Sequence, residues 1–228
     1  QIARTAIELL TSDGALILDP YCGSGTTMLE AALTGRRSIG IDLSPLAVLI
    51  SRVKTTPVGY SRTSSEIQRV RERLAPVFEP QLGLWESRCS QPEGLEDTEP
   101  DFRISDPWYT KWFQAEALEQ LVAIYREVVG IVDDDVRHIG LVAFSDILRK
   151  SSNAHSGYPN VMFDRNRGPV QPPWSSFIAR FEEIARLVEG LPGFADSIQP
   201  IVLEGDATSL NLDAGSIDAV ITHPPYIG

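Results

Sequence analysis

A nine-residue segment near the start of the chain carries residue types suited to holding a cofactor. Residues 19–27 read Asp-Pro-Tyr-Cys-Gly-Ser-Gly-Thr-Thr and directly follow the apolar run 15–18. A short buried strand therefore delivers a carboxylate, Asp19, into a turn whose two glycines let the backbone approach a ligand closely. A helix-forming run follows from Met28 to Leu33. This strand, turn and helix are typical of a nucleotide-type cofactor site.

A second strand must lie beside the first to complete such a site. The segment Ser38 to Asp42 is apolar and ends in an acid, and Asp42 follows Gly23 by 19 positions. That is about the distance at which a carboxylate at the tip of the second strand meets ribose hydroxyls. The two strands and the helix between them predict one right-handed βαβ unit in an α/β protein.

Several ligands are compatible with a glycine-rich turn of this kind. A phosphate-cradling P-loop is excluded, because it requires a Gly-Lys-Ser/Thr ending and Gly25 is followed by Thr26 and Thr27. A dinucleotide site has a third glycine at the position of Met28, whose side chain would obstruct a close pyrophosphate. S-adenosylmethionine has no phosphate, and its sulfonium and amino groups favour carboxylates such as Asp19. A tight turn without any ligand stays open as an alternative.

Three segments resemble the DNA amino-methyltransferases, which methylate the exocyclic nitrogen of adenine or cytosine. Residues 19–27 resemble the cofactor motif, and residues 40–47 (Gly-Ile-Asp-Leu-Ser-Pro-Leu-Ala) are similar to the same family. Residues 219–226 (Ala-Val-Ile-Thr-His-Pro-Pro-Tyr) resemble its catalytic motif. The resemblance implies a Rossmann-like methyltransferase fold: a mostly parallel sheet with helices on both faces and a helical insertion. It also implies S-adenosylmethionine as cofactor, DNA as partner, a cytoplasmic location and a role in restriction-modification.

The resemblance also assigns individual residues to the site. The residues that it assigns to cofactor binding are Asp19, Pro20, Tyr21, Cys22, Gly23, Gly25, Thr26, Asp42, Leu43, Asp206 and Ala207. Within this set, Asp206 follows an apolar strand and is expected to accept a hydrogen bond from the amino group of the cofactor's adenine. Catalysis goes to Thr222, His223, Pro224, Pro225 and Tyr226.

The chemistry of amine methylation explains this choice of catalytic residues. An exocyclic amine is a poor nucleophile because its lone pair is delocalised into the ring. The site must hold the nitrogen in line with the methyl group and accept hydrogen bonds from its protons. The Pro-Pro pair fixes the backbone so that a carbonyl can be one acceptor, and Tyr226 offers a flat face to a flipped base. A cysteine nucleophile is not needed, and neither Cys22 nor Cys89 has the setting of one.

One residue departs from the family pattern. The family has Asp, Asn or Ser immediately before Pro-Pro, whereas this chain has His223. A neutral imidazole accepts one hydrogen bond and its protonated form accepts none. Thr222 also occurs in the cytosine-type variant, Thr-Ser-Pro-Pro-Tyr, which favours cytosine N-4 over adenine N-6 as the target. An RNA guanine amino-methyltransferase and a non-catalytic cofactor-binding subunit of a modification complex stay open as alternatives.

The composition fits a globular enzyme better than a DNA-binding protein. The 228 residues are 43% hydrophobic, enough for a substantial core, and carry a formal net charge of −11. This charge disfavours DNA, because neutralisation of phosphates by basic residues supplies most non-specific DNA affinity. Basic residues must then gather locally, and the candidates are residues 69–73 and 165–167. Otherwise DNA contacts come from regions outside this sequence. The chain shows no membrane-spanning run, no metal-ligand spacing and no disulfide framework, and it leaves the oligomeric state undefined.

The chain divides into three expected parts. Residues 1–56 hold the cofactor motif, residues 57–200 form a helical insertion that is a candidate substrate- or DNA-contacting subdomain, and residues 201–228 return to the methyltransferase domain. Within the insertion, the sequence predicts a short charged helix at 64–74 and a loop-rich stretch from Pro76 to Pro100. Apolar residues at helical spacing predict helices at 118–132 and 174–188, and the segment 136–148, apolar nearly all round, predicts a helix buried on most sides. The polar loop from 151 to 169 is its functional candidate. Only four parallel strands are identifiable, so we expect the C-terminal strands of the fold to be missing from this sequence.

Overall fold

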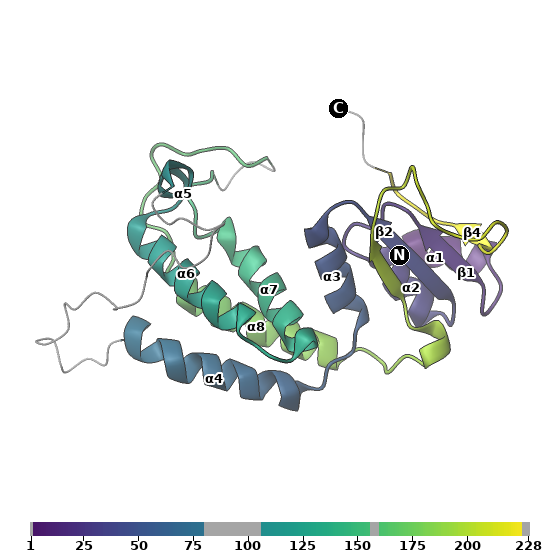
Figure 1. Ribbon diagram of the computed structural model, residues 1–228, viewed down its shortest axis with the longest axis horizontal. Helices are drawn as coiled ribbons and strands as arrows, with labels where there is room; N and C mark the ends of the chain where they lie inside the picture. The colour runs from purple at the N-terminus through teal and green to yellow at the C-terminus, as the bar shows by residue number, and fades with distance from the viewer. Residues whose placement is uncertain (1, 80–105, 156–159, 225–228) are drawn as a thin grey trace, which may run out of the picture. The chain divides into compact units, whose positions relative to one another are not determined.

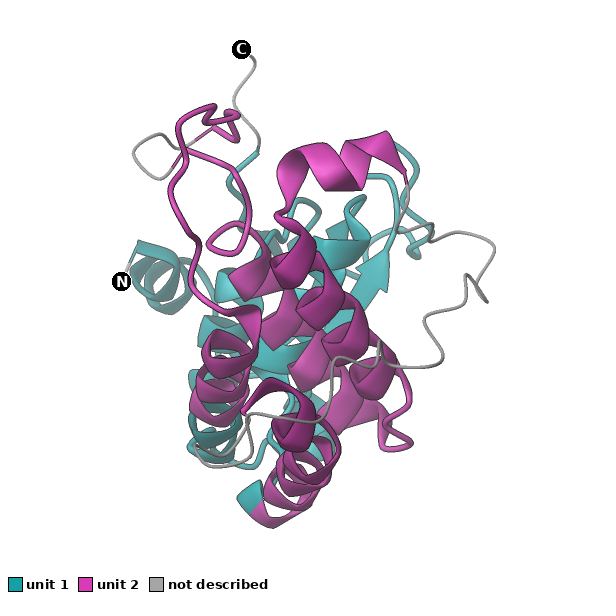
Figure 2. Ribbon diagram, turned by 90° about the vertical axis from the view of Figure 1, so that its left-hand side faces the viewer, with its two compact units in different colours: residues 1–60, 185–228 teal, residues 61–184 magenta. Residues whose placement is uncertain are grey.

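The computed structural model describes residues 2–79, 106–155 and 160–224 (Figure 1). These residues form two compact units, shown in different colours in Figure 2. The first, which we call the sheet unit, comprises residues 1–60 and 185–228. The second, the helical unit, comprises residues 61–184.

The sheet unit contains four parallel strands in the order β3-β2-β1-β4. The strands are β1 (Leu16–Asp19), β2 (Arg37–Asp42), β3 (Ile201–Glu204) and β4 (Ala219–Val220). The helices of this unit are α1 (Ile2–Leu10), α2 (Thr26–Leu33), α3 (Pro45–Thr55) and the short 3-10 helix η1 (Asp196–Ile198). The predicted α/β fold with a parallel Rossmann-like sheet is confirmed.

The two faces of the sheet pack against different segments. Successive residues of a strand point to opposite faces, so Ile17 and Leu18 belong to different parts of the core. Ile17 packs with Ile7 of α1 and Ala31 of α2. Leu18 packs with apolar residues of β2 and with the segment between β3 and β4; these residues are Ile39, Ile41, Leu212 and Ile217. Burial on both faces explains why β1 reads as a continuous apolar run, whereas β3 and β4 are more exposed.

Contact between α2 and β2 depends on Gly40. A Cβ atom added at Gly40 would lie 2.7 Å from Sδ of Met28, whose side chain is completely buried. Met28 therefore lies in the core, where it packs with Cys22, Val48 and Val202. The prediction that Met28 would obstruct a pyrophosphate was wrong, because its side chain is used to pack α2 against the sheet. In a dinucleotide site, a glycine at the start of the helix lets helix and strand pack closely. In this protein Gly40 of β2 has that role.

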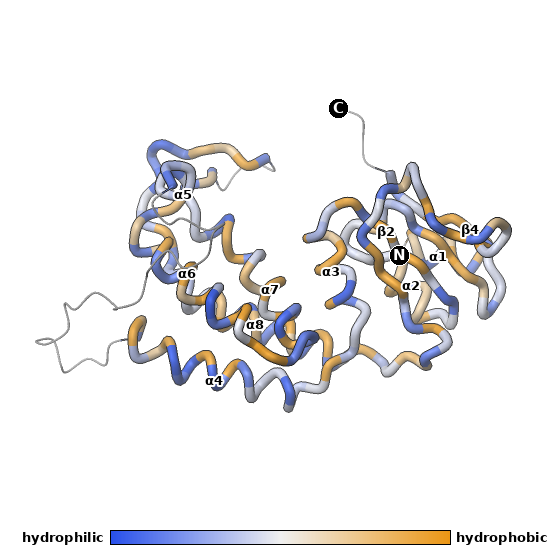
Figure 3. Tube along the Cα trace, in the orientation of Figure 1, coloured by the Kyte–Doolittle hydropathy of each residue, from blue (hydrophilic) through white to orange (hydrophobic). Residues whose placement is uncertain are grey.

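The helical unit is built from amphipathic helices, as predicted. Its helices are α4 (Tyr60–Phe78), α5 (Pro107–Trp112), α6 (Ala115–Val129), α7 (Asp134–Leu148) and α8 (Pro173–Glu189), the last of which extends beyond residue 184. The three helices predicted at 118–132, 136–148 and 174–188 correspond to α6, α7 and α8, except that α6 ends at Val129 and leaves Val132 exposed. Helix α4 alternates between hydrophobic and hydrophilic residues along its length (Figure 3). It is longer than the predicted 64–74 segment.

Proline 76 does not end α4. The prediction that a loop-rich stretch begins at this residue was wrong, because α4 includes Pro76 and continues to Phe78. Pro76 has no N–H to donate to the Glu72 carbonyl, so α4 loses one backbone hydrogen bond and continues for only two more residues. The rest of that stretch, residues 80–100, lies outside the described residues.

Aromatic side chains and ion pairs join the helices of this unit. The rings of Tyr125 in α6 and Phe144 in α7 have centroids 5.6 Å apart, and Phe177 and Phe181 of α8 are completely buried. The basic residues of α4 form ion pairs with acids of the same unit: Arg69 with Glu66, Arg71 with Glu182 and Arg73 with Glu127. These three arginines are therefore not the free basic face that the sequence suggested. None of the described helices is both long and apolar enough to cross a membrane.

Candidate functional site

The two sequence motifs meet at the carboxyl edge of the sheet. Strand β4 pairs with β1, so the residues that follow each strand emerge at the same edge. The hydroxyl of Thr222 donates a hydrogen bond to Oδ1 of Asp19 at 2.7 Å, and the amide of Ile221 donates to the carbonyl of Leu18 at 3.0 Å. The opening and closing motifs, 203 positions apart, are thus in direct contact.

This contact lies at the point where the strand order reverses. From β1 the chain proceeds to β2 and β3 on one side, and β4 pairs on the other side of β1. In open α/β sheets, ligands bind in the crevice outside the carboxyl ends of the strands at such a switch point. Asp19 is only 3% exposed, and its Oδ1 also accepts a hydrogen bond from the Tyr21 amide at 3.2 Å. The carboxylate is therefore held in one orientation at the reversal.

The glycine turn after β1 is closely packed. Gly23 and Gly25 have φ angles of 51° and 76°, which residues with a side chain rarely adopt. A Cβ atom added at Gly25 would lie 2.7 Å from Oγ and 2.9 Å from Cα of Ser51. Ser51 also donates a hydrogen bond to the carbonyl of Gly23 at 2.8 Å. The turn is thereby fixed against helix α3.

Asp42 joins the glycine turn to the start of α3. Its Oδ2 accepts from the Gly23 amide and its Oδ1 from the Ser44 amide, both at 2.9 Å. Ser44 in turn caps α3 by accepting a hydrogen bond from the Ala47 amide. Each carboxylate oxygen of Asp42 thus accepts one hydrogen bond from a backbone amide and can accept another. Asp42 therefore shapes the turn and is still able to contact a ligand.

Two residues near the turn were missed by sequence reasoning. Ser51 and Lys54 are polar residues in the C-terminal half of α3 with no motif to mark them, and only the packing of α3 brings them to the turn. Lys54 Nζ donates to Thr26 Oγ1 at 3.0 Å, at the start of α2. Burial lowers the pKa of this lysine, and the nearby Glu30 partly opposes the shift.

The acids after β3 continue the same edge. Glu204 pairs in register with Asp42, and the Gly205 amide donates to the Asp42 carbonyl at 3.0 Å. Asp206 is exposed, and its Oδ1 accepts from both the amide and the hydroxyl of Thr208 at 2.8 Å. The hydrogen bond from the Thr208 amide is the main cause that lowers the pKa of Asp206, and the hydrogen bond from the Thr208 hydroxyl lowers it further. The carboxylate is thus kept ionised and oriented.

The other predicted site residues differ in exposure. Tyr21 and Leu43 are 40% and 71% exposed. Cys22 is buried, and desolvation raises the pKa of its thiol to about 11. Thr222, His223 and Pro224 of the closing motif are exposed, whereas Pro20 and Ala207 are intermediate. Pro225 and Tyr226 lie outside the described residues.

The chemistry of this edge suits a cationic ligand. Carboxylates of Asp19, Asp42 and Asp206 follow three neighbouring strands, and none of the three forms an ion pair among the described contacts. Like charges repel a pyrophosphate, whereas a sulfonium and an ammonium group are attracted. The residues present therefore fit S-adenosylmethionine better than a dinucleotide.

Comparison with known proteins agrees with this assignment. Residues 1–52 match the family model N6_N4_Mtase, described as DNA methylase. The type II methyltransferase M.MvaI of Kocuria varians is 28% identical over 159 residues, which are 68% of this chain and 32% of the relative. The type II methyltransferase M.BsoBI of Geobacillus stearothermophilus is 24% identical over 233 residues, or 96% of this chain and 45% of the relative.

A third relative acts on a different substrate by its name. The tRNA (guanine(10)-N2)-dimethyltransferase of Methanocaldococcus jannaschii is 25% identical over 157 residues, which are 61% of this chain and 44% of the relative. The chain thus spans less than half the length of each of these three relatives. The family match at residues 1–52 covers β1, the glycine turn and β2, which are the elements that hold Asp19 and Asp42. Residues 1–52 thus resemble the N6/N4 DNA methylase family, and the chain is similar to type II methyltransferases over a larger part of its length.

Proposed function

We propose that this protein transfers a methyl group from S-adenosylmethionine to the exocyclic amino group of a DNA base, with cytosine N-4 favoured over adenine N-6. The observation that carries the proposal is the hydrogen bond from Thr222 to Asp19, since it joins the expected cofactor site to the expected base site. Two relatives named type II methyltransferases support DNA as the substrate. Thr222, shared with the cytosine-type motif, supports the choice of base.

In this proposal the carboxyl edge holds the cofactor. Asp19 and Asp42 face its positively charged and hydroxyl groups, and Asp206 accepts a hydrogen bond from its adenine amino group. The glycine turn brings backbone amides within reach because no side chain intervenes. When bound, S-adenosylmethionine supplies an electrophilic methyl group. Pro20, Tyr21, Cys22, Thr26, Leu43 and Ala207 complete the proposed cofactor site.

The closing motif acts on the base. The segment from Thr222 to Tyr226 holds the amine so that its lone pair points at the methyl group and its protons meet acceptors. An imidazole nitrogen of His223 supplies one acceptor and a backbone carbonyl of the Pro-Pro pair supplies another. Thr222, the first residue of this segment, is anchored on the buried Asp19, a group that the β1 core fixes in place. Orientation of the amine, rather than covalent catalysis, is therefore the main task of the protein.

A second candidate is methylation of a guanine amino group in RNA. It is favoured by one observation, the similarity to a tRNA guanine dimethyltransferase. The same edge of the sheet would serve either substrate, because both reactions use an exocyclic amine. In a third alternative, His223 marks a cofactor-binding subunit without activity.

Mass spectrometry of nucleosides separates these functions. Unmethylated DNA and bulk tRNA are each incubated with the protein and S-adenosylmethionine, digested and analysed. We expect N4-methylcytosine from the DNA and its loss with the His223→Ala variant. N6-methyladenine would correct the target base, and methylguanosine from tRNA would favour the second candidate. Binding of S-adenosylhomocysteine in calorimetry without any methylated product would favour the inactive subunit.

A further inference from the structure

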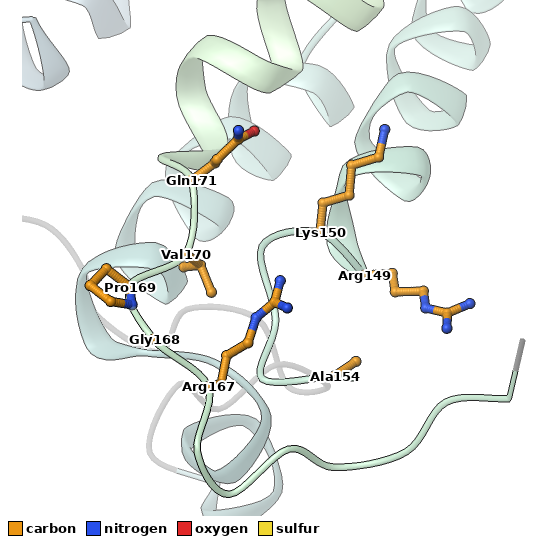
Figure 4. Close-up of a pocket in the computed structure, with 8 residues that line it drawn as sticks. All are labelled: Arg149, Lys150, Ala154, Arg167, Gly168, Pro169, Val170 and Gln171. Carbon is orange, nitrogen blue, oxygen red and sulfur yellow. The ribbon is translucent and has the colours of Figure 1, made fainter. Parts of the chain in front are cut away.

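The helical unit contains a cavity bordered by basic residues. Its volume is about 720 Å³, and it lies between the C-terminal end of α7 and the segment that leads to α8 (Figure 4). Arg149 and Lys150 border it from the α7 side, and Arg167 and Gln171 from the other. Among the described residues that line it, none is acidic. A concentration of positive charge at one cavity is unexpected in a chain with a net charge of −11.

Hydrogen bonds fix the walls of this cavity. The side chain of Gln114, just before α6, donates to the Gly168 carbonyl at 3.2 Å and to Asn153 Oδ1 at 3.4 Å. Asn153 donates through its own side chain to the Lys111 carbonyl at 3.0 Å. An antiparallel bridge joins Ala154 to Phe163. The segment that carries Arg167 is thus tied to the segment that follows Lys150, so the basic groups are kept at one cavity.

Helix-end electrostatics explains only part of this arrangement. Arg149 and Lys150 directly follow α7, where cations interact favourably with the helix dipole. Lys150 also lies 3.9 Å from Asp146, a carboxylate that Arg180 contacts more closely at 3.1 Å. Arg167 comes from a different segment and gains nothing from the end of α7, yet it extends into the space between the two walls (Figure 4). Arg149 points away from Arg167 in Figure 4 and donates a hydrogen bond to the His155 carbonyl at 3.4 Å, so Arg167 is the cation best placed to meet an anion in the cavity.

We propose that this cavity binds the phosphate backbone of DNA, with Arg167 as the principal contact. The inference rests on the proposed function, because that function makes DNA the substrate. Arginine suits this role, since its planar guanidinium donates two parallel hydrogen bonds to a phosphate. Phosphate contacts position a protein on DNA without reading its sequence. The cavity would accordingly supply affinity for DNA, which the net negative charge of the chain opposes.

Fluorescence anisotropy of a labelled DNA duplex tests this inference. Binding is measured at several salt concentrations for the 228-residue chain and for the Arg167→Gln and Arg165→Gln variants. Each phosphate contact contributes about −0.9 to the slope of log K against log salt. We expect Arg167→Gln to flatten the slope by about 1 and to weaken binding roughly tenfold at low salt. Arg165, an exposed arginine that does not line the cavity, is the matched control and should leave the slope unchanged.

Three outcomes would overturn the inference. These are no DNA binding by the chain, equal slopes for both variants, and Arg167-dependent binding of a matched RNA but not of DNA. If Arg167→Gln proves unfolded by circular dichroism, Lys150→Gln must give the flattened slope and Arg167→Lys must restore part of the binding. Binding of S-adenosylhomocysteine is recorded in parallel. If Arg167→Gln flattens the salt dependence but no methylation is detected, only the proposed activity is refuted. If methylation is detected but Arg167→Gln leaves the salt dependence unchanged, only the role of the cavity in DNA binding is refuted.

Discussion

The two units of this chain present opposite charges at their candidate sites. The carboxyl edge of the sheet unit gathers Asp19, Asp42 and Asp206, whereas the cavity of the helical unit gathers Arg149, Lys150 and Arg167. The net charge of −11 is a sum over the whole chain and does not give the local charge at either site. Local charge, set by which segments the fold brings together, decides whether a cationic cofactor or a polyanion is attracted. Changes confined to one unit should therefore affect one ligand and spare the other.

The largest effect is expected from Gly25→Ala. The new Cβ would overlap the backbone and side chain of Ser51, and the φ angle of 76° would be strained. We expect a loss of about 2–4 kcal/mol in the free energy of unfolding. Calorimetric titration should show no measurable binding of S-adenosylhomocysteine, while DNA binding persists. Gly14→Ala is the matched control, because Gly14 has the same φ of 76° with no atom within 4 Å of the added Cβ. Equal losses in both variants would contradict the role of Ser51.

A smaller effect is expected from Thr222→Val. This change removes the hydrogen bond to Asp19 and leaves the side-chain shape nearly unchanged. A hydrogen bond to a charged group is worth about 1.5–3 kcal/mol, so methyl transfer should slow by at least roughly tenfold. Affinity for S-adenosylhomocysteine should change little. Thr222→Ser retains the hydroxyl and should keep most of the activity; similar rates for the two variants would show that the hydrogen bond is dispensable.

The helical unit is tested by Asp133→Ala. Asp133 caps α7 by accepting hydrogen bonds from the amides of Asp135 and Val136, and it also pairs with Arg62. Loss of such a cap costs about 1 kcal/mol. Urea unfolding should show this loss, and DNA binding should weaken as α7, which leads into the cavity, becomes less stable. Cofactor affinity should be unaffected, and a parallel fall in both affinities would mean that the units are not independent. Asp134→Ala is a suitable control, since Asp134 makes no cap.

The smallest effect is expected from Asp206→Asn. An amide oxygen still accepts one hydrogen bond, so affinity for S-adenosylhomocysteine should fall only about two- to threefold. Asp206→Ala removes the acceptor and should cost roughly tenfold, in line with one hydrogen bond. Because hydrogen bonds from Thr208 keep the pKa of Asp206 low, affinity in the wild type should not decline as pH is lowered toward 5. Identical affinities for the wild type and Asp206→Ala would remove this residue from the cofactor site.

Sequence reasoning was most successful where local patterns determine structure. The apolar runs before Asp19 and Asp42 predicted β1 and β2, because strands buried on both faces need little but apolar residues. The apolar patterns of α6, α7 and α8 were equally visible. In contrast, Ser51 and Lys54 gave no signal, since their role depends on how α3 packs against the turn.

Tertiary contacts also explain the errors. Arg69, Arg71 and Arg73 form a basic run in the sequence, but ion pairs with acids from three helices use them internally. Arg167 was one of two arginines singled out in its loop, and only the fold distinguishes it from Arg165 by directing it to the cavity. Met28 was interpreted as facing a ligand because its position in a motif does not reveal the direction of its side chain.

The pairing of β1 with β4 has a consequence for synthesis of the protein. Strand β1 is complete at residue 19, but its neighbour ends at residue 220. At about 5–20 residues per second, a ribosome needs roughly 10–40 s to make the intervening chain. Throughout this interval one side of β1 has unpaired backbone groups, which are prone to join other strands. The nascent polypeptide is therefore a candidate client for chaperones until β4 emerges.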